Sequence, residues 1–427
     1  IIPIFLLLFV NCSFDNKTGI WKNENENKKI SLSNSNLEDA FKKEKVILEE
    51  KKVLPDSAIN IDRVETIKNW TQNFYNNYNN VPNTNYKNQK IKILKTSKLA
   101  KISVYSDLNL IKLNEPFYYQ NTIIYNDVRG NIYIYSINNK KKIFSYNFYK
   151  KKFKKINKKL YTVIKDNIIY VADNLGYLYA LDVNSSKTIW AKNFGIPFRT
   201  EIKIVNNQLL VSDQDNNIFS VNIINGEKNW TINTAEQFLK SNFINSIVYH
   251  KEDNILFLNT SGELYSINLL KGINWVLNFK PTSIDEESQL FLSLPLVINN
   301  ENLIVSNNIS VSNLDPKTGV KKWSKPYNLT SKPTISKNNL FFVSNNLLTC
   351  LNIKTGEVIW SKSIKIKNPE NTYYKALKDI DVITNLTIAN NKVLLFSLNG
   401  YLLTFKIKNG KMLSADKISK KGFGSNP

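Results

Sequence analysis

A chain of 427 residues with 42% hydrophobic and 12% aromatic residues can bury a sizeable core, which excludes wholesale disorder. One histidine, His250, and two cysteines, Cys12 and Cys350, argue against zinc fingers, histidine-rich metal sites and a disulfide framework. The formal charge of +23 is spread along the chain among many Asn and Ile residues. We interpret this charge as a compositional bias and expect no nucleic-acid partner.

The first 12 residues resemble a bacterial lipoprotein signal that has lost its start. The apolar run 1–10 is too short for a transmembrane helix, which needs about 20 residues, and it stops at Asn11-Cys12. In such signals the cysteine thiol, here that of Cys12, receives the lipid and the cysteine becomes the mature N-terminus. Phe9 and Asn11 depart from the usual residues, and a buried apolar strand is the alternative. Ser13 in the next position resembles lipoproteins sorted to the outer membrane.

Residues 13–60 are rich in Asn, Lys, Glu and Ser, which predicts a polar tether. Apolar residues spaced from Leu37 to Leu48 indicate one short helix within this tether. The remainder, residues 61–427, is predicted to form one folded domain.

A repeat dominates this domain. Each copy has a short strand with alternating apolar residues, then an Asx turn with Gly, then a second strand with an aromatic residue. Seven copies are marked by Gly130, Gly176, Asn216, Gly262, Leu314, Leu351 and Gly400. The tryptophans of the series are Trp190, Trp230, Trp275, Trp323 and Trp360, and in the last copy Gly410 is followed by Leu413.

The spacing of the repeat identifies its architecture. Four of the tryptophans follow the Asx position by eight residues, as Trp190 follows Asp182, and successive copies lie about 40 to 50 residues apart. Two short strands upstream in each copy complete a four-stranded antiparallel sheet. The sequence therefore predicts an all-β fold, a β-propeller of four-stranded blades with seven repeats, in which each Trp packs between neighbouring blades. Cys350 is expected to be a small core residue and His250 a solvated one.

The motifs Leu314-Asp-Pro-Lys-Thr-Gly-Val-Lys-Lys-Trp323 and Leu351-Asn-Ile-Lys-Thr-Gly-Glu-Val-Ile-Trp360 resemble the quinoprotein (PQQ-like) propeller repeat. Together with the lipoprotein-like start, the tether and the segment Asn69-Trp70-Thr-Gln-Asn, they are similar to the BamB family of outer-membrane β-barrel assembly lipoproteins. The resemblance implies a non-catalytic scaffold on the periplasmic face of the outer membrane of a Gram-negative bacterium. Its implied partners are the POTRA domains of the assembly barrel and unfolded outer-membrane proteins.

Two other functions stay open, a PQQ-dependent dehydrogenase and a ligand-binding periplasmic propeller. The resemblance to such dehydrogenases implies a calcium ion and, in many of them, a vicinal cysteine pair, which this sequence lacks. The sequence around Asp213, Asp215 and Asp285 is typical of turns and shows no pattern of a hard-cation site. We therefore expect no catalytic residue, no metal site and no cofactor.

The BamB resemblance implies that loops connecting the blades bind the partner. The corresponding candidates are Phe238, Leu239 and Lys240 in one connection and Asp285, Glu286 and Glu287 in another, although neither segment reproduces the family pattern residue by residue.

The family's ring has eight blades. Segment 91–104 resembles an outer strand of a partial eighth blade, so we expect the natural chain to continue beyond Pro427.

Overall fold

The computed structural model describes residues 12–14, 21–23, 50–51, 59–85, 115–149, 153, 155–234, 243–280, 291–365 and 380–419. The chain divides into two compact units, residues 1–45 and 46–427. In the first unit, two short strands, β1 (Cys12–Phe14) and β2 (Trp21–Asn23), pair antiparallel. Within the described ranges, no helix is long and apolar enough to span a bilayer. The helix expected between Leu37 and Leu48 lies outside those ranges.

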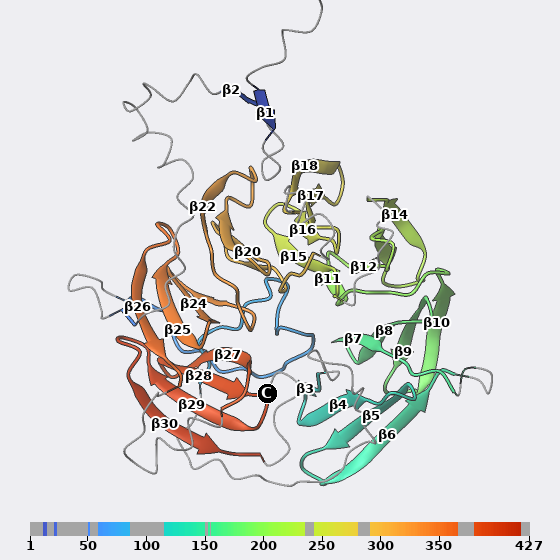
Figure 1. Cartoon of the computed structure of the whole chain (residues 1–427). Helices are drawn as coiled ribbons and strands as arrows, with labels where there is room; N and C mark the ends of the chain where they lie inside the picture. The colour runs from blue at the N-terminus through green and yellow to red at the C-terminus, as the bar shows by residue number, and fades with distance from the viewer. Residues whose placement is uncertain are drawn as a thin grey trace, which may run out of the picture. The chain divides into compact units, whose positions relative to one another are not determined.

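The described residues of the second unit form seven four-stranded antiparallel sheets, each made of four consecutive strands (Figure 1). We number these sheets blades 1 to 7 in chain order. The first strands of successive blades contact one another, for example β11 with β15 and β23 with β27, so the first strand of each blade is its inner strand. This arrangement confirms the predicted β-propeller.

The strands of blades 1 to 4 are short, as is usual in propellers. Blade 1 consists of β3 (Phe117–Tyr119), β4 (Thr122–Asn126), β5 (Asn131–Ser136) and β6 (Lys141–Asn147). Blade 2 consists of β7 (Leu160–Lys165), β8 (Ile168–Asp173), β9 (Tyr177–Asp182) and β10 (Lys187–Asn193). Blade 3 consists of β11 (Lys203–Val205), β12 (Gln208–Ser212), β13 (Ile218–Asn222) and β14 (Lys228–Ile232). Blade 4 consists of β15 (Ser246–His250), β16 (Asn254–Leu258), β17 (Glu263–Asn268) and β18 (Gly272–Asn278).

Blades 5 to 7 repeat the same order. Blade 5 consists of β19 (Val297–Ile298), β20 (Leu303–Ser306), β21 (Val311–Leu314) and β22 (Lys321–Lys325). Blade 6 consists of β23 (Thr334–Ser336), β24 (Asn339–Ser344), β25 (Leu347–Asn352) and β26 (Val358–Ser363). Blade 7 consists of β27 (Ile383–Ala389), β28 (Lys392–Ser397), β29 (Tyr401–Lys406) and β30 (Met412–Lys417).

Asparagine and aspartate form the turns between the first two strands of most blades. Asn206 and Asn207 both have positive φ, 46° and 59°, as a two-residue type I′ hairpin turn requires. Asp166 with Asn167 and Asn390 with Asn391 have the same conformation. Asn and Asp tolerate this left-handed region better than most residues do, which explains how a chain with only 13 glycines makes so many tight turns.

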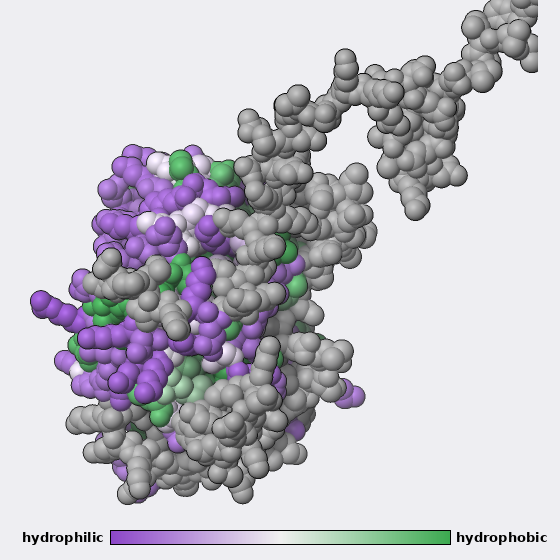
Figure 2. Space-filling view, turned by 60° about the vertical axis from the view of Figure 1, so that its left-hand side comes forward, coloured by the Kyte–Doolittle hydropathy of each residue, from purple (hydrophilic) through white to green (hydrophobic). Residues whose placement is uncertain are grey.

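Six apolar clusters join the seven blades pairwise, from blades 1 and 2 to blades 6 and 7. Among the described residues, no apolar cluster joins blade 7 to blade 1. The corresponding face of blade 7 has its own small cluster around Leu394 and Leu402. The predicted partial eighth blade, segment 91–104, lies outside the described residues. Hydrophilic residues cover most of the described surface in Figure 2, and apolar residues show there only in small patches.

Candidate functional site

A β-bulge in the outer strand sets the position of the repeated tryptophan. In blade 2 the pairing of β9 with β10 shifts between Thr188 and Trp190, and this shift places Trp190 opposite the small residue Ala180. The same shift places the other tryptophans opposite small or short residues, namely Ser220, Ser266, Asn313 and Cys350. Cys350 is fully buried, and burial raises the pKa of its thiol.

Each of these tryptophans lies against the next blade, and in most cases against its turn glycine. A Cβ atom built on the glycine would meet the indole of the preceding blade at Gly226, Gly319, Gly356 and Gly410. The indole N–H also donates to a turn carbonyl of that next blade. These bonds join Trp190 to Ile223 (3.2 Å), Trp275 to Lys317 (2.9 Å), Trp323 to Ile353 (2.7 Å) and Trp360 to Ile407 (3.1 Å).

Trp230 is the exception. It packs in the cluster between blades 3 and 4, but its buried Nε1 has no hydrogen-bond partner among the described residues. In blade 4 the turn is one residue shorter, from Asn268 to Trp275, and nothing lies within 4 Å of a Cβ built on Gly272. Because its turn is shorter, blade 4 offers the Trp230 indole neither a glycine to pack against nor a carbonyl to accept its N–H.

The repeat also differs in its first and last copies. In blade 1, Phe144 lies opposite Ile134 in the tryptophan position. In blade 7 the residue in that position is Ser414, opposite Thr404, whereas Leu413 is the bulged residue and is 39% exposed. The sequence pattern aligns the apolar Leu413 with the tryptophans, whereas the eight-residue spacing counted from Lys406 gives Ser414.

An asparagine-rich segment, residues 69–85, contacts the inner strands of all seven blades in chain order. We call it the strap, and Figure 1 shows it in light blue across the middle of the ring. Its contacts on successive inner strands are Trp70 with Tyr118, Thr71 with Ile164, Asn77 with Ile204, Asn77 with Tyr249, Tyr78 with Ile298, Asn80 with Ile335 and Thr84 with Ile388.

The strap also joins blade 1 to blade 7, the pair of neighbouring blades that no apolar cluster of the described residues connects. Trp70 and Tyr118 of blade 1 exchange two main-chain hydrogen bonds of 2.6 and 3.0 Å. At its other end, the N–H of Thr84 donates to Ile388 of blade 7 (3.0 Å), and Asn390 donates back to Thr84 (2.9 Å).

Before the strap begins, the tether residue Lys51 and Asp62, which follows the tether, also contact the propeller. Lys51 pairs with Ser361 on the outer strand of blade 6, and Asp62 accepts a hydrogen bond from Ser336 on its inner strand.

Two lysines donate hydrogen bonds to the strap. Lys203, on the inner strand of blade 3, is 1% exposed, and its ammonium donates to Asn76 O (3.1 Å) and Asn79 Oδ1 (2.6 Å). Lys332 donates to Asn79 O at 2.7 Å. Burial lowers the pKa of Lys203 to about 7, because the charged ammonium loses its hydration there.

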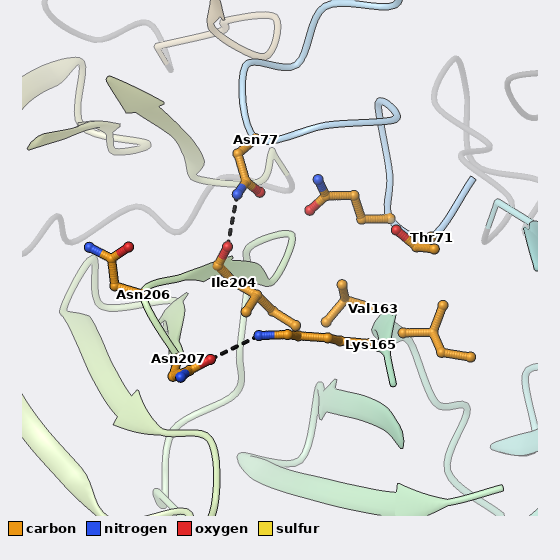
Figure 3. A pocket seen from close by; sticks show the side chains of 9 residues that line it. Thr71, Asn77, Val163, Lys165, Ile204, Asn206 and Asn207 are labelled. Atoms are coloured by element: carbon orange, nitrogen blue, oxygen red, sulfur yellow. Dashed lines mark hydrogen bonds between the residues drawn. The ribbon is translucent and has the colours of Figure 1, made fainter. Parts of the chain in front are cut away.

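A pocket of about 350 Å³ opens between the strap and blades 2 and 3 (Figure 3). Residues of the strap, of β7 and of the turn after β11 line it. They are Thr71, Gln72, Asn77, Val163, Ile164, Lys165, Ile204, Asn206 and Asn207. Lys165 extends from the end of β7 and donates to Asn207 Oδ1 at 2.9 Å, and Asn77 donates to Ile204 O at 2.8 Å.

The candidate partner-binding residues Phe238, Leu239, Lys240, Asp285, Glu286 and Glu287 lie outside the described residues. Their segments connect β14 to β15 and β18 to β19. Each inner strand begins at such a connection and ends at the turn that leads to its second strand. Since the pocket is lined by the end of β7 and the turn after β11, these connections leave from the opposite face of the ring.

The other residues singled out in the sequence have structural positions. Asp213 is a buried turn residue whose carboxylate accepts the main-chain N–H groups of Asp215 and Asn217, both at 2.9 Å. His250 lies at the end of β15, 3.3 Å from Asn300 O. Cys12 lies in β1 opposite Asn23. No group of three His, Cys, Asp or Glu residues in the described part of the chain could hold a metal ion.

Seven blades with a repeated indole-to-glycine contact define a β-propeller built from PQQ-like repeats. The chain belongs to the family of the outer membrane protein assembly factor BamB, whose sequence model matches residues 128–280 and 284–423. This membership confirms the resemblance found in the sequence motifs.

Two relatives match the chain by sequence. An uncharacterised protein of Rickettsia conorii is 25% identical over 70% of this chain and 73% of its own length. The outer membrane protein assembly factor BamB of Moranella endobia is 19% identical over 59% of this chain and 65% of its own length.

Two solved structures share the fold. BamB from Moraxella catarrhalis has a TM-score of 0.57 at 14% identity, with 73% of this chain and 89% of that chain covered. A europium-containing methanol dehydrogenase has a TM-score of 0.54 at 13% identity, with 84% and 86% covered. At such identities, these structures establish the fold alone.

Proposed function

We propose that this protein is a non-catalytic scaffold lipoprotein of the machinery that assembles outer-membrane proteins. The observation that carries the proposal is the family match, which extends from the second half of blade 1 through blade 7. The proposed location is the periplasmic face of the outer membrane of a Gram-negative bacterium, with a lipid on Cys12 and the N-terminal segment as a tether.

We further propose that the ring binds periplasmic POTRA domains through the connections 235–242 and 281–290. The described strands that flank both connections end at the same face of the propeller, so we propose that one partner contacts both. Lys240 in one connection and Asp285 to Glu287 in the other would supply charges of opposite sign to that surface. Rim charges of this kind mainly set the rate and the orientation of association.

Retention of the full chain on immobilised POTRA domains tests this function. Phe238→Ala, Leu239→Ala and Lys240→Glu are expected to weaken retention without changing the thermal unfolding midpoint. Lys375→Glu is the matched control, because it makes the same charge change in the connection from β26 to β27 on the same face.

Two results would contradict the proposal. Equal retention of all variants would remove these connections from the interface, and no retention of the wild type would remove the partner. Saturable binding of pyrroloquinoline quinone with calcium, accompanied by dye reduction, would instead favour the dehydrogenase alternative.

A further inference from the structure

The strap bonds to blades 3 and 6 through side chains rather than through pairs of main-chain groups. Main-chain hydrogen bonds join it to blades 1, 2, 4, 5 and 7. Among the described residues, no main-chain hydrogen bond joins the strap to β11, whose bonds with it use the side chains of Asn77 and Lys203. The strap turns at Phe74 and Tyr75, which both have positive φ, before it reaches β11.

In blade 6, an asparagine amide of the strap bonds to both main-chain groups of an inner-strand residue. The amide of Asn80 donates to Ile335 O (2.9 Å) and accepts from Ile335 N (3.0 Å), so both of its polar atoms are bonded. The amide of Asn77 donates to Ile204 O, but its Oδ1 is buried without a hydrogen-bond partner among the described residues. A buried acceptor without a donor costs about 1–3 kcal/mol, so a ligand N–H that donates to this oxygen would recover that free energy.

The pocket beside Asn77 supplies further unused polar groups. Gln72 is only 9% exposed, and neither its amide nor the hydroxyl of Thr71 has a hydrogen-bond partner among the described residues. The ammonium of Lys165 makes one hydrogen bond to a pocket residue, to Asn207, and no carboxylate lines the pocket. The walls between these groups are the apolar side chains of Val163 and Ile204.

We propose that this pocket binds the main chain of a short extended peptide segment. A peptide N–H would donate to Asn77 Oδ1, and the neighbouring carbonyl would accept from Gln72 and Lys165. The ring already binds one extended chain in this way, since the strap pairs with the inner strands on both sides of the pocket at Val163 and Tyr249.

This inference rests on the proposed function, because an assembly factor meets client chains before they fold. The pocket opens at one face of the ring, and the described strands that flank the proposed partner-binding connections end at the other face. A client segment and a partner domain would therefore bind at the same time.

Fluorescence polarisation with the full chain tests the site. The probe is a fluorescein-labelled eight-residue peptide of alternating threonine and valine, acetylated and amidated at its ends. Gln72→Ala and Lys165→Gln are each expected to weaken its binding about fivefold, the effect of one lost hydrogen bond. Lys337→Gln is the matched control, because Lys337 bonds to an asparagine oxygen beside the corresponding turn of blade 6 (3.0 Å), and its affinity should stay within about twofold of wild type.

A competitor with alternate N-methylated amides should fail to displace the probe. Displacement by that competitor, displacement by maltotriose, or equal binding by wild type and both pocket variants would overturn the proposal. Retention on POTRA domains should be unchanged in Gln72→Ala and Lys165→Gln. If the wild type binds the peptide but not the POTRA domains, the pocket stands and the partner assignment fails.

Discussion

A Cβ atom on Gly226 would lie 2.6 Å from Cε3 of Trp190, closer than real Cβ contacts come. The turn of blade 3 therefore receives the indole of blade 2 only because residue 226 has no side chain. Gly272 makes the opposite case, since it also has positive φ but has open space around it.

Alanine substitutions at these two glycines separate the cost of backbone strain from the cost of disturbing the contact with tryptophan. We expect Gly226→Ala to lower the free energy of unfolding by about 2–4 kcal/mol and Gly272→Ala by about 1 kcal/mol. The smaller loss is the strain of a left-handed alanine, which both variants share. Urea unfolding followed by fluorescence measures the difference, and equal losses would show that the indole contact contributes nothing.

The tryptophans should also differ in how much their N–H groups contribute. Trp323→Phe removes a 2.7 Å bond to Ile353 O, which keeps the amide of Asn313 as a second donor, whereas Trp230→Phe removes an N–H that has no acceptor among the described residues. We expect Trp323→Phe to cost about 1 kcal/mol more than Trp230→Phe in the free energy of unfolding, the net value of one hydrogen bond. The same urea experiment checks this order. If the indole rings contributed only through their volume, the two substitutions would cost the same.

Stability should rise with pH through the titration of Lys203. Its pKa is about 7 in the folded protein and about 10.5 in the unfolded chain, so between these values the unfolded state binds more protons. Relative to Lys203→Met, the wild type should therefore gain about 1 kcal/mol per pH unit from pH 7 to 10. Glu115, Glu201 and Lys332 remain in both proteins, so parallel pH profiles would contradict the buried-lysine interpretation.

The strap should contribute measurably to stability through its asparagines. Asn80→Ala leaves both main-chain groups of Ile335 without their partner and should cost about 2–3 kcal/mol. Asn85→Ala is the control, because its exposed side chain makes only a 3.4 Å contact with Thr66. Chemical denaturation compares the two, and similar losses would mean that the strap is held by other contacts.

Lipidation at Cys12 can be tested in a bacterial host with the natural full-length gene. Protein carrying Cys12→Ala should lose its partition into the detergent phase, and the wild type should begin at a modified Cys12 by mass spectrometry. Ser13→Ala keeps the thiol and serves as the control. An unmodified wild-type thiol would refute the anchor.

The blades were predictable from the sequence because their signals are local. Alternation within a strand, an Asx turn and a tryptophan eight residues later all lie within a few residues of one another, and seven copies reinforce the pattern. The deviations leave a trace in the spacing, but their structural consequences do not. The turn from Asn268 to Trp275 is visibly one residue shorter than the others, yet only the structure shows that Trp230 therefore has no acceptor among the described residues.

The strap and the pocket could not be predicted, because their bonds join residues far apart in the chain. Asn80 and Ile335 are 255 residues apart, and a run of asparagines has the same composition as a solvated linker. The density of asparagine between Asn69 and Asn85, interrupted by Trp70 and Phe74, is the only local signal, and it does not identify the acceptors.

The order of synthesis gives the strap a further consequence. Its residues leave the ribosome before any blade does, yet Thr84 bonds to Ile388, which is made 304 residues later. Each new blade adds one inner strand for the strap, and its binding site is complete only when the last blade has formed. We therefore expect docking of the strap to be the last step of folding, at which the ring gains its link between the first blade and the seventh.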